Sequence, residues 1–131
     1  MGSSNSAIEV LLSAWQKAIA SSDLDAIAEM VTEDAEFWSN GRAPLIGRQS
    51  VKDAFRPVFD SYTMSQEFRC DELVVADDLA FMRGLEVNRL VSRDTGQETT
   101  VHQRAFSVMR RSADGSWRFS RGMTNQPPEE P

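Results

Sequence analysis

Two carboxyl groups in the second half of the chain, with an arginine beside them, have the chemistry to move protons. Arg69, Asp71 and Glu86 lie on two neighbouring segments with a strand-like pattern, in which alternate residues share one face. Paired carboxyl groups beside an arginine can polarise a water molecule or hold an oxygenated ligand. The same residues can instead form a structural ion network at a solvent-exposed end of a sheet. Asp71 and Glu86 are therefore the candidate catalytic acids, and Arg69 is a candidate ligand contact.

The turns of the second half predict how these strands pair. From residue 62 onward, long strand-like segments are separated by turn signals at 77–78, 94–96 and 113–115. Placing Ala76 opposite Leu79 predicts three cross-strand pairs, which are Glu72 with Arg83, Val74 with Phe81, and Phe68 with Val87. Placing Asp94 opposite Gln97 predicts two more, which are Glu86 with Ala105 and Gly84 with Ser107.

One face of these strands, here called the cavity face, has the composition of a ligand pocket. An apolar end, a middle of small side chains and a polar end follow one another along it. The apolar end holds Leu73, Val75, Ala80, Met82 and Met109, the middle holds Gly84, Ala105 and Ser107, and the polar end holds Arg69, Asp71, Glu86, Asn88 and Gln103. Strands of roughly 15 residues would span about 50 Å if flat. They must therefore bend, and Gly84 is the expected bend or bulge.

The opposite face, here called the outer face, is also largely apolar. We expect it to carry Phe68, Cys70, Val74, Phe81, Leu85, Val87, Phe106 and Val108, interrupted by Arg83, Arg89, His102 and Arg104. Strands that are apolar on both faces must be covered on both, and the helices can cover only one. The sequence therefore predicts a homodimer joined through Phe68, Leu85, Val87 and Phe106, with the charged side chains at its rim. This register keeps both His102 and Cys70 out of the pocket.

The first half of the chain supplies the helices that must cover the cavity face. A helical stripe is formed by Ile8, Leu11, Leu12, Trp15 and Ile19. Ser6 and Glu9 predict a capping box that starts this helix. A second helix is expected near 23–31 and a strand at 34–39. A third helical stripe comprises Val51, Ala54, Phe55, Val58 and Phe59, and Pro57 within it should kink or shorten the helix.

Composition narrows the classes of partner. The chain has 131 residues, enough for one domain, and a formal net charge of −6, which argues against nucleic acid as the main partner. No segment approaches the roughly 18 apolar residues of a membrane span, and no secretory signal is visible at the start. We expect a cytoplasmic protein with one domain at 6–125, a flexible start at 1–5 and a flexible Pro/Glu tail at 126–131.

Cofactor chemistry has no support in the sequence. The single cysteine, Cys70, cannot form an internal disulfide. The chain shows neither a metal-ligand cluster nor a glycine-rich nucleotide loop. We therefore expect no metal and no cofactor.

The order of these elements resembles the nuclear transport factor 2-like superfamily. The resemblance covers about residues 6–125 and is carried by Asp23 to Ala35 and by the closing run 114–119, Asp-Gly-Ser-Trp-Arg-Phe. This group includes ketosteroid isomerases, SnoaL-like polyketide cyclases and limonene epoxide hydrolases. It implies an α+β fold in which a cone-shaped, curved antiparallel sheet wraps around N-terminal helices and encloses a pocket. The scaffold hosts many activities, so the resemblance fixes the fold better than the function.

The catalytic positions that the resemblance implies carry other residues here. Trp15 falls where ketosteroid isomerases have an oxyanion-hole tyrosine, Ser39 falls at their general base, and Ser107 at their protonated aspartate. Those roles belong to a well-described enzyme, and none of the three substitutes can serve as a general base unaided. The SnoaL-like cyclases keep an aspartate on the last strand, and the match there points to Gly122. Ketosteroid-type isomerisation and cyclisation are therefore disfavoured.

The pocket candidates follow from the faces, from the helical stripes and from the positions that the resemblance implies. We expect ligand contacts from Trp15, Phe37, Ser39, Phe55, Phe59, Arg69, Met82, Gln103, Ser107 and Arg121. The face of Arg121 depends on the last turn: a three-residue turn places it in the pocket and a four-residue turn places it outside. Burial of Trp117 and Phe119 favours the first, and the family match favours the second.

Three functions stay open on this sequence. The first is binding of a small hydrophobic, partly oxygenated molecule, in the role of an accessory or tailoring factor of secondary metabolism. The second is an enzyme of the polyketide cyclase, dehydratase or epoxide hydrolase type that uses Asp71 or Glu86. The third is a dimeric protein-association module.

Overall fold

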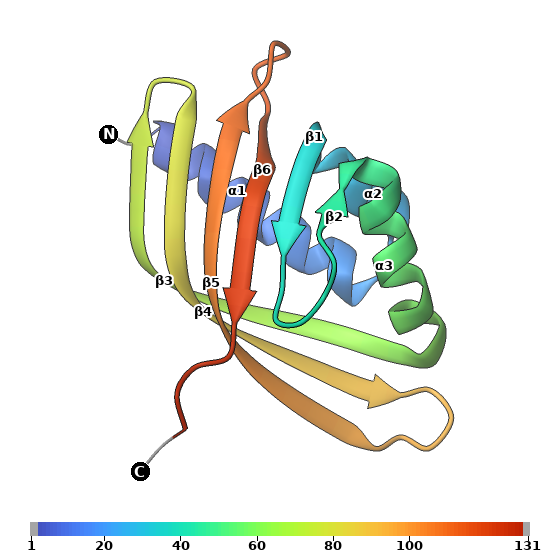
Figure 1. Cartoon of the computed structure of the whole chain (residues 1–131). Helices are drawn as coiled ribbons and strands as arrows, with labels where there is room; N and C mark the ends of the chain where they lie inside the picture. Colours follow the sequence, from blue (N-terminus) through green and yellow to red (C-terminus); the bar gives the residue numbers. More distant parts are fainter. Residues whose placement is uncertain (1–2, 130–131) are drawn as a thin grey trace.

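The computed structural model describes residues 3–129, which form three helices and six strands (Figure 1). The helices are α1 (Ser3–Ala20), α2 (Leu24–Glu29) and α3 (Gly47–Ser61). The strands are β1 (Val31–Trp38), β2 (Leu45–Ile46), β3 (Tyr62–Ala76), β4 (Leu79–Ser92), β5 (Glu98–Arg111) and β6 (Trp117–Asn125). The predicted α+β class is confirmed.

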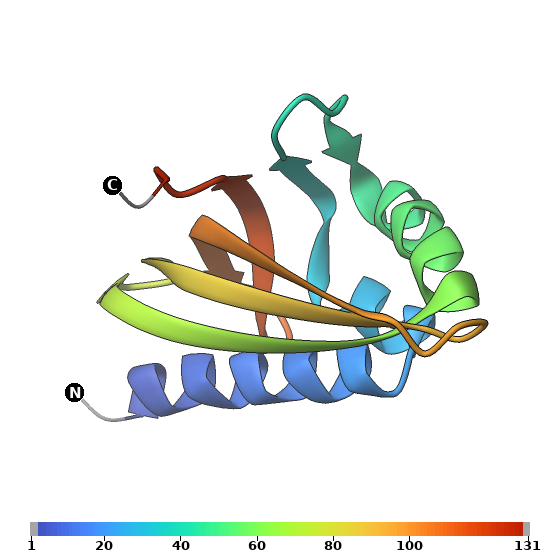
Figure 2. The ribbon, with the colours of Figure 1, turned by 90° about the horizontal axis from the view of Figure 1, so that it is seen from below.

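The strands form one curved, open sheet in the order β2-β1-β6-β5-β4-β3. Neighbouring strands are antiparallel except β1 and β6, which run parallel, so the sheet is not antiparallel throughout. Helix α1 lies along one face of the sheet, and the first part of β3 and the β4–β5 hairpin swing out towards α3 (Figures 1 and 2). This curvature gives the sheet a concave side that holds the core.

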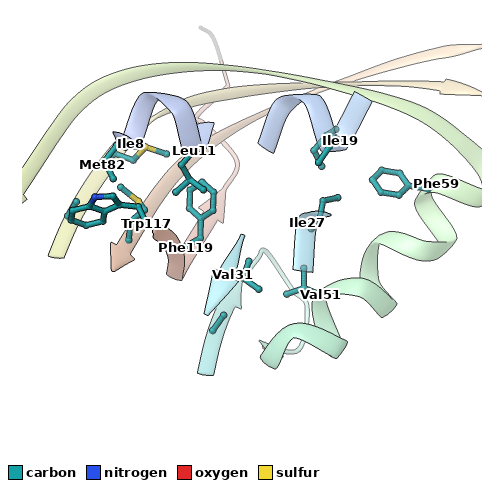
Figure 3. Close-up of a cluster of buried hydrophobic side chains, with 14 residues drawn as sticks. Ile8, Leu11, Ile19, Ile27, Val31, Val51, Phe59, Met82, Trp117 and Phe119 are labelled. Carbon is teal, nitrogen blue, oxygen red and sulfur yellow. The ribbon is translucent and has the colours of Figure 1, made fainter. Parts of the chain in front are cut away.

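The core is made where the apolar stripe of α1 meets the concave side. Ile8, Leu11 and Ile19 of α1 are buried in one cluster with Phe119 of β6 (Figure 3). Met109 of β5 belongs to the same cluster. Burying a side chain of this size contributes about 1.5–3 kcal/mol, so the stripe fixes which face of α1 turns towards the sheet. The stripe predicted from spacing is the one that is buried.

A bulge in β3 decides which of its residues face inwards. Cys70 pairs with Gly84 but Glu72 pairs with Arg83, so Asp71 is the extra residue. A Cβ atom at Gly84 would lie 1.9 Å from the carbonyl oxygen of Arg69, which is closer than atoms can approach. The bulge therefore requires glycine at this position, as the sequence predicted for a bend there.

The bulge makes part of the predicted register wrong. The pairs of Glu72 with Arg83 and of Val74 with Phe81 are confirmed. Beyond the bulge every β3 residue is displaced by one, so Phe68 lies opposite Glu86 and not opposite Val87. Because side chains alternate between faces, this single step moves Phe68 inwards and turns Arg69 outwards.

The β4–β5 pairing differs from the prediction by two residues. Glu86 lies opposite Gln103 and Gly84 opposite Ala105, where the sequence had suggested Ala105 and Ser107. A shift of two preserves the faces. The faces predicted for β4 and β5 are therefore right although the partners are wrong.

A second bulge, in β6, settles the position of Arg121. Val108 pairs with Arg121 and Met109 with Phe119, which leaves Ser120 as the extra residue. Trp117 and Phe119 are consequently buried while Arg121 is exposed on the outer face. The argument that Trp117 and Phe119 are buried and the argument that Arg121 lies outside the pocket are therefore both right, because the extra residue Ser120 lies between them.

The helices differ from expectation at two points. Helix α1 begins at Ser3 and not at Ser6, so 3–5 are helical, while residues 1–2 and 130–131 of the predicted flexible ends lie outside the described range. Helix α3 continues through Pro57 to Ser61 without being shortened. Pro57 is exposed, so water can satisfy the carbonyl of Asp53 that loses its helical hydrogen bond.

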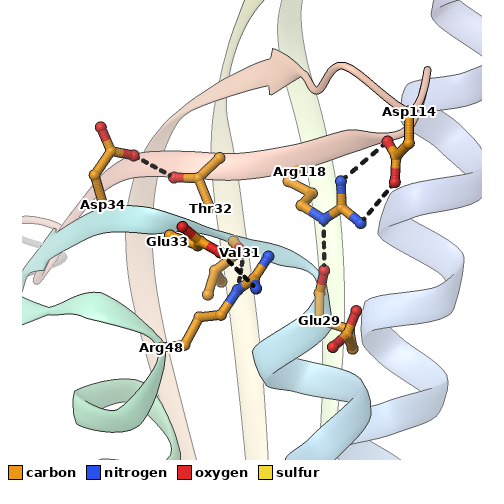
Figure 4. A network of polar contacts seen from close by, with 8 residues as sticks. All are labelled: Glu29, Val31, Thr32, Glu33, Asp34, Arg48, Asp114 and Arg118. Carbon is orange, nitrogen blue, oxygen red and sulfur yellow. Dashed lines mark hydrogen bonds and ion pairs between the residues drawn. The ribbon is translucent and has the colours of Figure 1, made fainter.

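Arg118 fastens the last hairpin to α2. Its Nε atom donates to the carbonyl of Glu29 at 2.8 Å, and its two terminal nitrogens lie 3.2 Å from the carboxylate oxygens of Asp114 (Figure 4). The hydrogen bonds from Arg118 lower the pKa of Asp114 to about 2. The Asp-Gly-Ser-Trp-Arg-Phe run thus acts as a clamp between the turn before β6 and the end of α2.

Candidate functional site

A cavity of about 280 Å³ lies between α1, α3 and the cavity face of the sheet. Its walls are mostly apolar, with six aromatic residues from three strands and two helices. The large apolar residues of the lining are Leu12 and Trp15 of α1, Val51 and Phe55 of α3, Phe37 and Trp38 of β1, Leu45 of β2, Met64 and Phe68 of β3, Met82 of β4, and Phe119 and Met123 of β6. Aromatic rings organise one wall, since Trp15 meets both Phe55 and Phe119 edge to face.

A chain of hydrogen bonds forms the polar end of the cavity. Trp15 Nε1 donates to Gln66 Oε1 at 3.0 Å, and Gln66 Nε2 donates to Asn88 Oδ1 at 2.8 Å and to Glu86 Oε2 at 3.2 Å. Asn88 Nδ2 in turn donates to Glu86 Oε2 at 2.9 Å and reaches Gln103 Oε1 at 3.5 Å. Side chains from α1 and from three strands thus form one network, in which Gln66 and Asn88 donate to the carboxyl group of Glu86.

Glu86 is the one ionisable residue among those that line this cavity. Burial raises the pKa of its carboxyl group, and the hydrogen bond from Asn88 opposes that effect only in part. Within residues 3–129, no ion pair joins Glu86 to an arginine or lysine. A carboxyl group held by neutral amides in an apolar pocket is suited to exchange a proton or to accept a ligand hydrogen bond.

Hydroxyl groups line other parts of the wall. Thr124 Oγ1 donates to Ser39 Oγ at 3.2 Å between β6 and the end of β1, and Ser107 of β5 lines the cavity between them and the polar end. Gly122 lies against Phe37, whose ring would be only 2.7 Å from a Cβ atom there. The glycine thus allows the aromatic ring to pack flat on β6.

The structure brings most of the predicted site residues together. Eight of them line the cavity, namely Trp15, Phe37, Ser39, Phe55, Met82, Glu86, Gln103 and Ser107. Phe59 does not line it, because it is buried in the core and stacks on Phe55 at 5.4 Å.

The predicted placement of Arg69 and Asp71 at the polar mouth is wrong. Asp71 is the extra residue of the β3 bulge, and the two side chains pair with each other at 3.0 Å at the exposed surface. Arg121 is also outside the cavity, and its guanidinium donates to the carbonyl of Asp34 at 2.7 Å. Of the two candidate acids, only Glu86 faces the cavity.

Gln66, Phe68 and Thr124 line the cavity but were missed as site residues. Gln66 and Phe68 belong to the part of β3 before the bulge, where simple alternation from the turn gives the wrong face. Asn88 was placed on the cavity face, and it is one of two buried polar residues within 3–129, at 7% exposure. An asparagine within a strand of apolar residues is the signal that could have marked the network.

The exposed apolar residues of the outer face differ from the strip that the sequence predicted. Trp38, Met123 and Phe106 lie in register across β1, β6 and β5 and are 52%, 46% and 43% exposed. Phe81 stacks on Phe106 at 5.5 Å. Phe68, expected here, lines the cavity instead, and His102 is exposed opposite Val87.

Comparison with known proteins identifies the family. The sequence profile of the SnoaL-like domain matches residues 12–119. The chain belongs to the SnoaL-like domain family. No protein with a curated description matches it.

Solved structures extend the likeness of this SnoaL-like domain to most of the chain. A conserved protein from Planctomyces limnophilus is 22% identical, with 98% of this chain and 100% of that one covered and a TM-score of 0.91. A ketosteroid isomerase-like protein from Erwinia carotovora atroseptica is 23% identical, with the same coverage and a TM-score of 0.83. A candidate scytalone dehydratase from Novosphingobium aromaticivorans is 16% identical, with 95% and 85% covered and a TM-score of 0.83.

These likenesses establish the fold, and the predicted membership of the nuclear transport factor 2-like superfamily is confirmed. Among residues 3–129, no three His, Cys, Asp or Glu side chains gather where a metal could be held. Within the same range, no helix has the length and apolar character needed to cross a membrane.

The raised pKa of Glu86 predicts how stability varies with pH. A pKa above the ordinary 4.5 in the folded state means that folding favours the protonated form of Glu86, so the stability that this group contributes is fully present below pH 4.5 and is lost as pH rises through the raised value. We expect Glu86→Gln, which has no such proton, to lose less free energy of unfolding over this interval than the wild type. Urea unfolding at a series of pH values measures this free energy for both proteins.

The matched control is Glu67→Gln, which makes the same change at an exposed residue on the other face of β3. Its profile should follow the wild type. Parallel profiles for wild type and Glu86→Gln would contradict the assignment of Glu86 as a desolvated acid.

Proposed function

We propose that this SnoaL-like domain binds a small hydrophobic, partly oxygenated molecule in the cavity. The observation that carries the proposal is the arrangement of the lining: an apolar cavity of about 280 Å³ with its amides and its single carboxyl group gathered at one end. Apolar walls supply binding free energy and a few convergent polar groups supply orientation. The resemblance to polyketide cyclases makes an accessory or tailoring role in secondary metabolism the proposed setting.

The composition of the lining also supports a neutral ligand over an anionic one. No lysine, arginine or histidine lines the cavity, and Glu86 is its only acid. An anionic ligand would meet a carboxyl group with no compensating cation, and burying an unpaired charge is costly. A neutral oxygenated molecule avoids that cost.

An enzyme remains the second candidate, because Glu86 combines burial, a raised pKa and a place in the cavity wall. Such a carboxyl group can act as a general acid or base. The serines at 39 and 107 and Trp15 do not titrate in that range, so proton transfer would depend on Glu86. Its substrate would share the ligand's apolar, oxygenated character.

If a compound is turned over, we expect Glu86→Gln to lower the rate by about 10²–10⁴-fold, the contribution typical of a lost general acid or base, with little change in affinity. Product formation and binding are measured on the same samples. A turnover rate that survives the substitution would exclude Glu86 as the catalytic group.

The binding proposal is tested by filling the cavity. We expect steroids, terpenes or polyketide-like aromatics to raise the melting temperature of the wild type, since a ligand present at 100 times its Kd stabilises the folded state by about 2.7 kcal/mol. Ser107→Phe places a ring inside the cavity and should abolish the shift. The control, His102→Phe, adds the same ring on the exposed face of the same strand and should retain it. A shift that persists in Ser107→Phe would place the binding site elsewhere.

We propose further that two copies of the domain pair through the outer face. Glu36 lies beside Arg121 in the register of β1 and β6, and Arg83 pairs with Glu72 at 2.8 Å on the other flank. The apolar row of Trp38, Met123 and Phe106 lies between these charges. A two-fold interface must be self-complementary, and a patch with both signs of charge at both flanks meets that requirement.

Phe106→Asp should convert the dimer to a monomer, because it places a charge within the apolar row. Sedimentation velocity measures the change. Val10→Asp, at a 68% exposed position on α1, should leave the dimer intact. A monomeric wild type at micromolar concentration would overturn the proposal.

A further inference from the structure

The indole of Trp15 sets the direction of every hydrogen bond at the polar end of the cavity. An indole N–H can only donate, so the side-chain atom of Gln66 that meets it must be the carbonyl oxygen. The amide nitrogen of Gln66 then points to Asn88 Oδ1 and Glu86 Oε2. Asn88 must in turn present its own nitrogen to Glu86 and Gln103.

This directed network leaves two groups available to a ligand. Both donated bonds to Glu86 end on Oε2, and no hydrogen bond from residues 3–129 reaches Oε1. Gln103 uses its carbonyl oxygen towards Asn88, and its amide nitrogen donates to no other group in the same range. The site therefore offers one strong acceptor and one donor.

The acceptor and the donor lie next to each other. Glu86 and Gln103 are directly paired residues of β4 and β5, and both side chains line the cavity. Side chains of directly paired residues start about 5 Å apart. A single ligand atom can therefore contact both.

We propose that the ligand is an alcohol or phenol whose hydroxyl group donates to Glu86 and accepts from Gln103. The inference rests on the proposed binding function and narrows its oxygenated end to one functional group. A hydroxyl group alone both donates and accepts through one oxygen. A ketone or ether can only accept, an ammonium can only donate, and a carboxylate only accepts and also carries the same charge as Glu86.

The remaining lining agrees with this assignment. No cation stands near the polar end to attract a carboxylate or phosphate, and the aromatic and aliphatic walls suit a ring system attached to the hydroxyl. The amides of Gln66 and Asn88 hold the carboxylate of Glu86 ready as an acceptor. Glu86 and Gln103 are thus the residues that determine specificity.

Four two-ring probes of matched shape test the proposal: 2-naphthol, 2-methoxynaphthalene, 2-naphthylmethylamine and 2-naphthoate. Calorimetric titration of the wild type should give 2-naphthol a Kd lower than that of 2-methoxynaphthalene by about tenfold or more, as expected for a hydrogen bond to a charged group. 2-Naphthol should also bind more tightly than 2-naphthylmethylamine, and 2-naphthoate should bind most weakly.

Two variants assign the preference to the named groups. Glu86→Gln should reduce the preference for 2-naphthol over 2-methoxynaphthalene to about threefold or less and should strengthen binding of 2-naphthoate, because the repelling charge is gone. Gln103→Leu should reduce the preference for 2-naphthol over 2-naphthylmethylamine. Glu67→Gln, on the exposed side of β3, should keep the wild-type order of affinities.

The outcomes separate this inference from the function on which it rests. If the wild type binds 2-naphthol and 2-methoxynaphthalene equally, or if Glu86→Gln keeps the full preference, the hydroxyl assignment is overturned while binding in the cavity stands. If the wild type binds none of the four probes, both the binding proposal and the hydroxyl assignment are overturned.

Discussion

The contact between the backbone of β3 and Gly84 is the constraint on which the site depends. Because the Arg69 carbonyl would lie 1.9 Å from any Cβ at position 84, the two strands can pair in this way only with glycine there. The extra residue at Asp71 changes the faces of the preceding part of β3. Without that change Gln66 would point outwards, and the network that holds Glu86 would lose its central amide.

The second constraint on the network is that the indole N–H of Trp15 can only donate a hydrogen bond. Side-chain amides can usually rotate by 180° and exchange oxygen for nitrogen, but an indole N–H requires an acceptor opposite it. The direction chosen at Gln66 is passed on to Asn88 and ends at Glu86. One hydrogen bond from α1 thereby determines that the carboxyl group receives N–H donors and that Gln103 keeps its N–H free.

Periodicity in the sequence predicted most of the fold because the apolar residues that build the core repeat with the spacing of their elements. The stripe on α1, the faces of β4 and β5, and eight cavity residues could be found in this way. The wrongly assigned faces of β3 have one cause. The bulge in this strand inserts a residue that a count from the turn does not include, so Phe68, Arg69 and Asp71 were assigned to the wrong faces. Gly84 signalled that the sheet bends, but glycine does not show on which strand the extra residue lies.

Two of the three positions that are catalytic in ketosteroid isomerases are occupied here by groups already engaged with the protein. Trp15 gives its single N–H to Gln66, and the hydroxyl of Ser39 is bonded to Thr124. An indole that has donated its only proton cannot also stabilise an oxyanion on a ligand. The polar contacts that the amide network leaves for a ligand therefore lie on β4 and β5, at Glu86 and Gln103, and the hydroxyl of Ser107 lines the cavity beside them. In this chain the one ionisable side chain of the cavity lining, Glu86, stands at none of those three positions, which is why the fold identifies the family and the side chains must identify a ligand.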